Sequence, residues 1–372
     1  MKIPFYRAKI DSDEKDNIND LLNGEFDNCI EELEDEFSSY VGSKYALATA
    51  HGTSALHLSL LALELKRGDK VLCSVNSYPA VPEVVRHFDA EPIFIDVDED
   101  SFNINLDKLE AYLMDNNSRK LKAVIASHIA GNPIDLTRLY SIASIYNIKV
   151  IEDASDALGA SYNGEKIGSL KADATCFSFM PHLKKSICGG GMLVTDDEAL
   201  YNRAKSLRNH AITVNDSDLE YIYDVNDIGN KYGMSELSGV FILAQLKKQE
   251  DALSRHKEIA SVYDKALEGV AHISIPINYS DHSYSNYIVK IDKNRDSFAR
   301  ELLKKGIKCG LHYIPLNFLS YYKEKYSLKI NDFPVALKNY QQVLSLPIFA
   351  DMSDEEVKYV CKSLKEVSKT RV

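Results

Sequence analysis

Apolar, strand-like segments alternate with helix-like segments over the first half of the chain, and this alternation restricts the possible folds more than any other feature. Strand-like segments are expected at residues 45–49, 70–74, 92–97, 123–128 and 149–152, with helical patterns between most of them. Such alternation favours a largely parallel sheet that is covered by helices on both faces. Two further strands, at 174–179 and 192–195, are expected to join the same sheet.

The last third of the chain has a different pattern, in which helices and strands mix without regular alternation. A chain of 372 residues is too long for one simple core. We therefore expect an N-terminal arm and a large α/β domain in residues 1–245, and a smaller α+β domain in residues 246–372. Residues 209–227 are polar and rich in tyrosine, and we expect them to form a loop over the functional site.

The overall charge and the cysteines exclude several classes of protein. A net charge of -11 argues against nucleic acid as the main partner, since that role usually needs a basic face. The six cysteines are scattered without a Cys-x-x-Cys pair, which argues against a zinc site and suits reduced thiols in a cytoplasmic protein. No apolar run is long enough to span a bilayer, so we expect no membrane partner.

Polar side chains follow two of the expected strands. Asp153 ends an apolar strand, and Ser178 and then Lys184 and Lys185 follow the next one. Ligands of open α/β sheets bind at the carboxyl ends of the strands. A carboxylate there can keep a pyridine nitrogen protonated, and a lysine can form a Schiff base with an aldehyde, which together indicate pyridoxal phosphate (PLP). The simpler interpretation is a salt bridge or helix cap at Asp153 and two solvated lysines.

Two other segments could complete such a site. Gly52, Thr53 and Ser54 lie between a strand and a helix, where free backbone N–H groups and two hydroxyls can bind a phosphate. Tyr78 follows a strand and could stack on a flat cofactor ring. Taken singly, Gly52, Thr53 and Ser54 could be an ordinary helix cap, and Tyr78 could be a half-buried loop residue. Together with the strand-end residues, they occur in an order that builds a single site.

With these residues in view, the chain resembles the sugar aminotransferases of the DegT/DnrJ/EryC1/StrS family, which have the fold type I (aspartate aminotransferase-like) architecture. The resemblance covers nearly the whole length. The motifs that carry it include Gly52-Thr53-Ser54-Ala55-Leu56-His57, Glu152-Asp153-Ala154-Ser155, Phe177-Ser178-Phe179, Leu207-Arg208-Asn209-His210 and His312-Tyr313-Ile314-Pro315-Leu316.

The resemblance implies an activity. Family members transfer an amino group from glutamate or glutamine to a keto group on a nucleotide-linked sugar, and we expect this reaction in cell-surface polysaccharide or glycan biosynthesis. Members are usually homodimers with sites at the subunit interface.

The resemblance also implies roles for individual residues. The cofactor-binding residues would be Gly52, Thr53, Ser54, Tyr78, Asp153, Asp156, Ser178, Lys184 and Lys231. Lys184 and Asp153 would be catalytic, and His182, His312 and Tyr313 would lie on the substrate side.

The chain departs from the family pattern at the lysine loop. In the usual spacing the Schiff-base lysine falls at Leu183, so that Lys184 is displaced by one position and Lys185 by two. A one-residue bulge after Pro181 would bring Lys184 into place. Lys185, or no covalent attachment at all, remain alternatives.

Other departures lie nearby. Asp156 stands where Gln or His is usual, and Cys188 begins the glycine turn that usually reads Gly-Glu-Gly-Gly. Lys231 begins the segment that usually reads Asn-Tyr-Arg, and it could reach the phosphate of the neighbouring subunit as a cation. Two alternatives to transamination follow from these changes: a keto-sugar dehydratase that uses His182 as its base, and a family member without catalytic activity.

Overall fold

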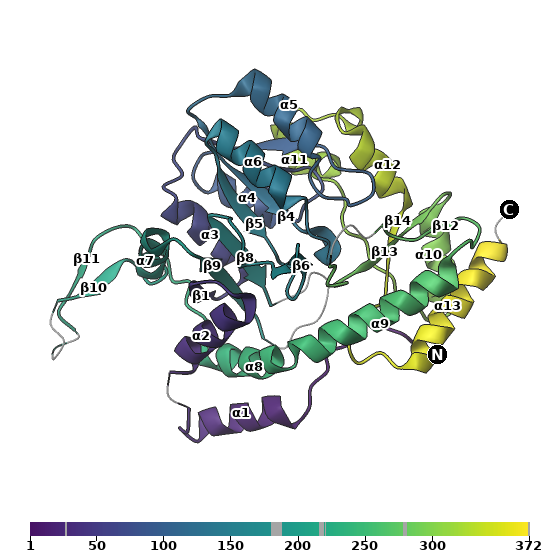
Figure 1. Cartoon of the computed structure of the whole chain (residues 1–372), viewed down its shortest axis with the longest axis horizontal. Coiled ribbons are helices and arrows are strands. Elements are labelled where there is room, and N and C mark those ends of the chain that lie inside the picture. The colour runs from purple at the N-terminus through teal and green to yellow at the C-terminus, as the bar shows by residue number, and fades with distance from the viewer. Residues whose placement is uncertain (27, 180–187, 216–218, 220, 278–280, 371–372) are drawn as a thin grey trace.

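A seven-stranded sheet forms the centre of the larger part of the molecule (Figure 1). The computed structural model describes the whole chain except residues 27, 180–187, 216–218, 220, 278–280 and 371–372. The strands are β1 (Tyr45–Thr49), β2 (Lys70–Ser74), β3 (Glu91–Ile95), β4 (Leu121–Ser127), β5 (Lys149–Asp153), β8 (Ala174–Ser178) and β9 (Gly191–Thr195). Their order is β1-β9-β8-β5-β4-β2-β3, and of these seven strands β9 is the one that runs in the opposite direction to the other six. The predicted, largely parallel sheet is present.

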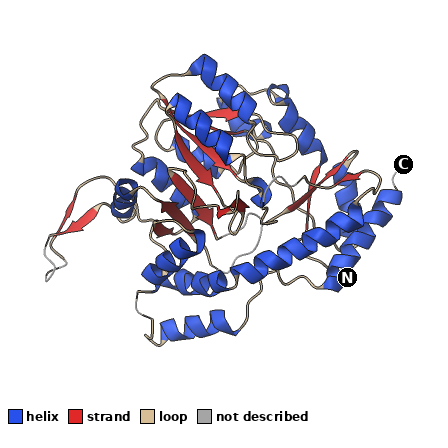
Figure 2. Cartoon of the chain, in the orientation of Figure 1, coloured by secondary structure: helices blue, strands red, loops and turns tan. Residues whose placement is uncertain are grey.

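Helices cover both faces of this sheet, as Figure 2 shows. They are α2 (Cys29–Val41), α3 (Gly52–Ala62), α4 (Ala80–Arg86), α5 (Leu106–Asn116), α6 (Leu136–Tyr146), α7 (Glu198–Leu207) and α8 (Glu236–Lys247). Helices α2, α5, α6 and α8 pack on one face, and α3, α4 and α7 on the other. Helix α1 (Ser12–Leu22) lies against α8 at the edge of the molecule.

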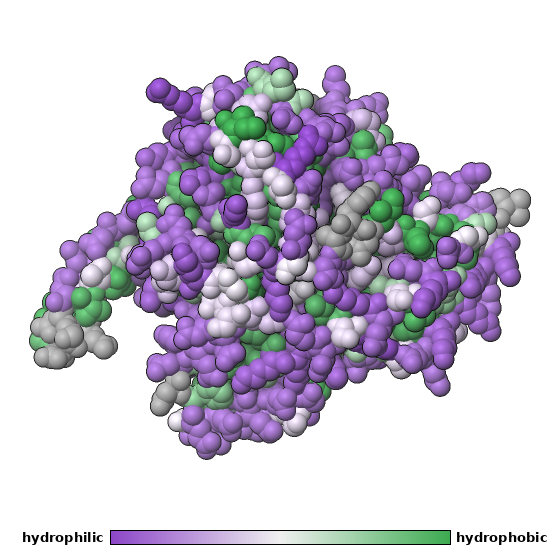
Figure 3. Space-filling model, in the orientation of Figure 1, coloured by the Kyte–Doolittle hydropathy of each residue, from purple (hydrophilic) through white to green (hydrophobic). Residues whose placement is uncertain are grey.

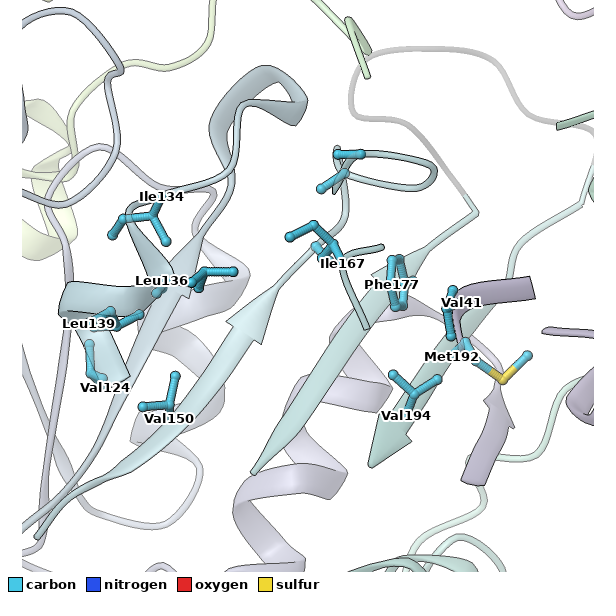
Figure 4. Close-up of a cluster of buried hydrophobic side chains, with 14 of the residues drawn as sticks. Val41, Val124, Ile134, Leu136, Leu139, Val150, Ile167, Phe177, Met192 and Val194 are labelled. Atoms are coloured by element: carbon cyan, nitrogen blue, oxygen red, sulfur yellow. The ribbon is translucent and has the colours of Figure 1, made fainter. Parts of the chain in front are cut away.

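The strand side chains explain the two covered faces. Successive residues of a strand point to opposite faces. On β4, Val124 belongs to the core under α6, whereas Ile125 belongs to the core under α3. Figure 4 shows the first of these cores, with Val124, Val150 and Phe177 facing the same way from three strands. Because both faces are buried, the strands are continuous apolar runs rather than alternating ones.

The smaller part of the molecule is built on a three-stranded antiparallel sheet of β12 (Ile273–Ser274), β13 (Tyr287–Ile291) and β14 (Val343–Leu346). The helices that pack on it are α9 (Gln249–Leu267), α10 (Arg295–Lys304) and α13 (Asp354–Lys369). Helices α11 (Ser320–Lys325) and α12 (Pro334–Gln342) instead share a small core with Val75 and Val97, which follow β2 and β3 of the larger sheet. Ile3 of the N-terminal arm is buried in this second core. Helix α9 runs from the larger to the smaller part (Figure 1). The division of the chain at residue 245 stays a prediction.

Short elements complete the chain. They are β6 (Ser161–Tyr162), β7 (Glu165–Lys166), β10 (Ile212–Val214), β11 (Tyr223–Val225) and three 3₁₀ turns at Ile129–Gly131, Leu316–Phe318 and Ile330–Asp332. The β10–β11 hairpin projects from the body (Figure 1), where the sequence had suggested a loop over the site. Among the described residues, no helix combines the length and the apolar character needed to cross a membrane.

Candidate active site

The predicted site residues at the strand ends are brought to one edge of the central sheet. Asp153, the last residue of β5, lies opposite Cys176 of β8. Ser178 ends β8 opposite Gly191, the first residue of β9, and Gly191 also lies opposite Thr49 of β1. Helix α3 begins just after β1. The carboxylate, the serine and the start of α3 therefore meet at this edge.

Asp153 is buried and held by neutral donors. It is 7% exposed. The hydroxyl of Ser127 donates to Oδ2 at 3.1 Å. The hydroxyl and the N–H of Ser155 donate to Oδ1 at 2.6 and 3.2 Å. Within the described chain no lysine, arginine or histidine lies within 4.0 Å of this carboxylate. A buried carboxylate is costly without a cation or strong donors, so the site suits a ligand that carries a positive N–H group.

The start of helix α3 is open to a ligand. In the described structure its N-cap residue, His51, makes no side-chain hydrogen bond to the first turn. Gly52 packs so closely on β8 that a Cβ at residue 52 would lie 2.6 Å from Cβ of Ser178. Thr53 is exposed and Ser54 is buried. The unsatisfied N–H groups of a helix start, beside a serine hydroxyl, form a site for a phosphate.

Two tyrosines line the small cavity that contains Asp153. The ring of Tyr78, which is 40% exposed, lies 6.2 Å from that of Tyr313, measured between centroids, at an angle of 58°. The N–H of Tyr313 donates to Asn76 Oδ1 at 3.1 Å, which holds the loop against the end of β2. Both rings are therefore placed beside the carboxylate, where a flat ligand would contact them.

Asp156 lies in the same cavity and is also held by hydroxyls. Oη of Tyr313 donates to its Oδ2 at 3.4 Å, and Oγ of Ser285 donates to its Oδ1 at 3.4 Å. Burial raises the pKa of Tyr313 well above its usual value, and the charges of Asp156 and Asp153 raise it further. Tyr313 is therefore a protonated donor throughout the physiological range.

A buried polar network lies behind Asp153. The Glu152 side chain is fully buried, and its carboxylate accepts from Oη of Tyr140 and, at 3.4 Å, from Oγ1 of Thr175. Nε2 of His128 lies 3.2 Å from Glu152 Oε2. Because His128 Nδ1 accepts from the N–H of Ile134 at 3.3 Å, a neutral imidazole here carries its proton on Nε2. The network fixes the strand ends on which the site is built.

The smaller part of the molecule contributes to the wall of the site. The N–H of Ser283 donates to the carbonyl of Gly131 at 3.1 Å, and its hydroxyl donates to the carbonyl of Asp156 at 3.0 Å. The N–H of Asn286 donates to the carbonyl of Ala130 at 3.3 Å. Gly131 has φ of +86°, and a Cβ there would lie 1.9 Å from Oγ of Ser283. Only glycine fits this contact, which joins the two parts beside Asp156.

A larger groove begins at this wall. Its volume is about 640 Å³, and it extends from Asp156 to the N-terminal arm and to the junction of α8 and α9. Residues that line it include Lys9, Phe179, Phe241, Gln245 and His256. A groove of this size is typical of binding sites for organic molecules larger than a cofactor ring.

Other predicted residues lie elsewhere. His312 is 2% exposed, with Nδ1 2.7 Å from Oγ of Ser345, and it is not among the residues that line the Asp153 cavity. Lys231 is exposed and donates to Oδ1 of Asn209 at 3.1 Å, also away from that cavity. The roles of both residues stay predictions. Lys184, Lys185 and His182 lie outside the described residues.

Sequence reasoning gave no role to Ser127, Ser155, Asn76 or Ser285, which hold the predicted residues in place. Ser155 had a local signal, since a serine two residues after an aspartate often closes a turn on its carboxylate. Ser127 had none in the local sequence, because its contact depends on the register that places it opposite Asp153.

The whole chain is similar to known proteins. The model of the DegT/DnrJ/EryC1/StrS aminotransferase family matches residues 8–365. The chain is 30% identical over 370 residues to the GDP-perosamine synthase of Escherichia coli O157:H7, and 98% of each protein is covered. It is 31% identical over 353 residues to the spore coat polysaccharide biosynthesis protein SpsC of Bacillus subtilis, with 91% of this chain and 90% of that protein covered.

Solved structures are similar as well. A Streptococcus pneumoniae protein with a proposed sugar aminotransferase activity, solved in its PLP form, superposes with a TM-score of 0.90 at 27% identity over 99% of each chain. The aminotransferase from Psychrobacter cryohalolentis gives a TM-score of 0.90 at 25% identity over 98% of each chain. These similarities confirm the predicted fold class.

Proposed function

Because the chain belongs to the DegT/DnrJ/EryC1/StrS aminotransferase family, we propose that it transfers an amino group from glutamate or glutamine to the keto group of a nucleotide-linked sugar. The chain is a PLP-dependent sugar aminotransferase. The finer assignment is supported by relatives that are named for GDP-perosamine synthesis and for spore coat polysaccharide biosynthesis. We propose a role in the biosynthesis of a cell-surface polysaccharide or glycan.

One observation carries the proposal: a buried carboxylate, held by two serines, shares a sheet edge with an uncapped helix start. These groups fit PLP. Asp153 would pair with the pyridine nitrogen, and the start of α3 with Ser178 would bind the phosphate. Tyr78 would contact the ring face. Bound PLP supplies an electron sink for negative charge that develops on the substrate.

The residues of the chain have distinct tasks in this proposal. Asp153 would pair with the pyridine nitrogen and so favour the protonated form of that nitrogen. Tyr313 and Asp156 hold one wall of the cavity through their hydrogen bond. We assign to Lys184 both the covalent attachment of PLP and, as a free amine, the movement of a proton at the substrate carbon.

The lysine assignment has a direct test. Purified enzyme is reduced with borohydride, digested and mapped by mass spectrometry, and the PLP label is expected on Lys184. Lys184→Ala should remove the label and the amination of sugar, whereas the neighbouring control Lys185→Ala should keep both. A label on Lys185 would move the role to that residue. Bound but unattached cofactor, with release of ammonia and loss of a sugar hydroxyl, would refute transamination in favour of a dehydratase.

The 640 Å³ groove beside Asp156 supports a substrate larger than a free sugar. We propose that the nucleotide part of the substrate lies there, with the keto-sugar toward Asp156 and Tyr313. Keto-sugars linked to GDP, UDP or dTDP should be offered with isotope-labelled glutamate or glutamine. The expected product is an amino-sugar that carries the label. Amination of free keto-sugars at the same rate would refute the nucleotide requirement.

Homodimer formation is supported by the projecting β10–β11 arm. Its apolar side chains are exposed, as the green patch on the arm in Figure 3 illustrates. Tyr221, between the two strands, is 75% exposed, Val225 of β11 is 53% exposed, and Ile228, just after β11, is 87% exposed. A two-stranded hairpin is marginally stable alone, so this arm needs a partner surface. We propose that the arm packs on a second copy of the chain, and that Lys231 at its base then reaches the phosphate of the other site.

Light scattering tests the dimer. The wild-type protein should have the mass of two chains, and Ile228→Glu should weaken this association. Ile145→Glu is the matched control, because Ile145 is also strongly exposed, at 68%, but lies on α6. A monomeric wild-type protein with full activity would refute the shared site.

Two further points stay proposals. All six cysteines are free thiols, which supports a cytoplasmic location. The separate second core supports the division into a large domain at 1–245 and a small domain at 246–372.

A further inference from the structure

Helices α9 and α13 lie side by side in the smaller part of the molecule (Figure 1), and an open groove of about 470 Å³ lies along them. The groove shares no lining residue with the Asp153 cavity or with the larger groove beside it. Its apolar lining is formed by Val262 and Ala266 of α9 and by Cys361 of α13. The other lining residues are Lys358, Lys362, Lys365, Lys369 and Glu366.

The four lysines form a row on one face of α13. They are spaced by four, three and four residues, which places them above one another on a helix. The row is about 16 Å long, at 1.5 Å per residue. All four side chains are exposed. We call this feature the lysine row.

Among the described residues, few carboxylates touch the lysine row directly, although the charges of Lys358 and Lys369 still act on Asp354 and Glu366. Asp354 pairs with Arg255 at 2.6 Å, and Glu366 pairs with Lys305 at 2.7 Å, so two carboxylates of α13 are already engaged. Nζ of Lys362 lies 3.9 Å from Oε1 of Glu366, which is a long ion-pair distance. For the other three lysines, the described part of the chain provides no carboxylate within 4.0 Å.

We propose that this groove binds an acidic amphipathic helix of a partner protein. Apolar side chains of that helix would pack on Val262, Ala266 and Cys361. Its acidic side chains, repeated every three to four residues, would match the spacing of the lysine row. Charge complementarity of this kind increases the association rate and selects the partner.

Other ligands fit the groove less well. A small anion would need a buried polar side chain to hold it, whereas the lysines are all exposed. An anionic membrane surface would meet a chain of net negative charge, and the apolar residues would lie in a groove rather than on a protruding face. These alternatives are outcomes of the test below.

The test uses the full-length, PLP-loaded enzyme and a fluorescent synthetic peptide. The peptide is a helix of about 15 residues with leucine at every third or fourth position and glutamate elsewhere. A second peptide has the same composition in scrambled order. Anisotropy is expected to show binding of the patterned peptide that is about tenfold or more tighter than binding of the scrambled one.

Charge reversal locates the binding site. Lys362→Glu/Lys365→Glu should weaken binding of the patterned peptide about tenfold or more. Val262→Asp should also weaken it, while sugar amination stays unchanged in both variants. Lys66→Glu is the matched control for the single variant Lys362→Glu, because both change the net charge equally and the two lysine side chains are 75% and 74% exposed.

Three results would overturn the proposal: equal affinity for the scrambled peptide, equal weakening by Lys66→Glu, or no binding of either peptide. Binding of phosphatidylglycerol vesicles or of pyrophosphate that is lost in Lys362→Glu/Lys365→Glu, without peptide binding, would assign the lysine row to a membrane or to a phosphate instead. The inference does not depend on the proposed substrate.

Discussion

Gly191 offers the sharpest test of the phosphate-binding geometry, because a single methyl group there would separate two elements of the site. Gly191 begins β9, opposite both Thr49 and Ser178. A Cβ at residue 191 would lie 2.5 Å from the backbone nitrogen of Gly52 and 2.5 Å from the carbonyl carbon of His51. These atoms belong to the backbone at the start of α3, so no side chain can rotate away.

The size of the effect follows from this overlap. Ordinary contact begins near 3.4 Å, so Gly191→Ala must move the start of α3 or the end of β9 by roughly an ångström. Overpacking of this kind costs about 1–3 kcal/mol of stability. A shift of about an ångström at a binding element can lower its contribution by up to about a hundredfold, so we expect PLP affinity to fall by about tenfold to a hundredfold.

Two measurements check the prediction. Urea unfolding of the apo protein gives the stability change, and absorbance titration gives the affinity for PLP. Gly233→Ala is the control, because Gly233 has no left-handed φ and a Cβ there would meet nothing within 4 Å. If Gly191→Ala matched this control in both stability and PLP affinity, the close approach of β9 to α3 would not shape the phosphate site.

Three further predictions concern charge and hydrogen bonding. Asp153→Asn should keep the fold, because the amide oxygen can still accept from Ser155 and the amide NH2 can donate to the hydroxyl of Ser127. It should lower the amination rate by at least about a hundredfold, and a smaller loss in steady-state kinetics would remove the proposed role. Tyr313→Phe should lower the free energy of unfolding by about 0.5–1.5 kcal/mol through loss of its bond to Asp156, and unchanged urea midpoints would contradict that bond. Burial lowers the pKa of His57 to about 4, with help from His87, and lowers that of His282 to about 3. In the unfolded chain both histidines take up protons below about pH 6.5, so the free energy of unfolding should fall as the pH drops from 6.5 toward 4, by about 3 kcal/mol for His57 alone. The urea midpoint measured over this range checks the prediction. A flat midpoint, or the same pH slope in the variant His57→Asn/His282→Asn, would contradict it.

The central sheet could be predicted because the apolar character of its strands in the sequence agrees with their burial between two layers of helices. Residues such as Val124 and Ile125 face opposite cores, so a strand buried on both sides is a continuous apolar run. Asp153 and Ser178 could be placed from the same signal, since they are the residues at which such runs end.

The C-terminal part was less predictable. The sequence pattern at residues 333–344 is helical throughout, but α12 ends at Gln342 and β14 begins at Val343. Residues 308–313 have a strand-like pattern, but the structure shows only an isolated bridge there, between Gly310 and Ser345. In both places pairing with a distant segment decides the backbone conformation, and β14 forms because it pairs with β13.

The projecting arm was misjudged for a related reason. Residues 209–227 are polar and rich in tyrosine, which indicates a surface loop. In the structure, β10 and β11 pair as a hairpin whose apolar side chains are exposed. The surface that these exposed apolar residues are proposed to meet belongs to another copy of the chain. The local sequence therefore contains no signal for it.

The contact between Ser283 and Gly131 has a consequence for protein engineering. Because the smaller part of the molecule donates hydrogen bonds to the backbone of Gly131 and Asp156, it forms part of the wall of the proposed site. If the proposed site is correct, exchanging the smaller part with the corresponding segment of a relative is expected to change substrate selectivity as well. A chimera of this kind would also need glycine at residue 131, since any larger residue would force the joined halves apart.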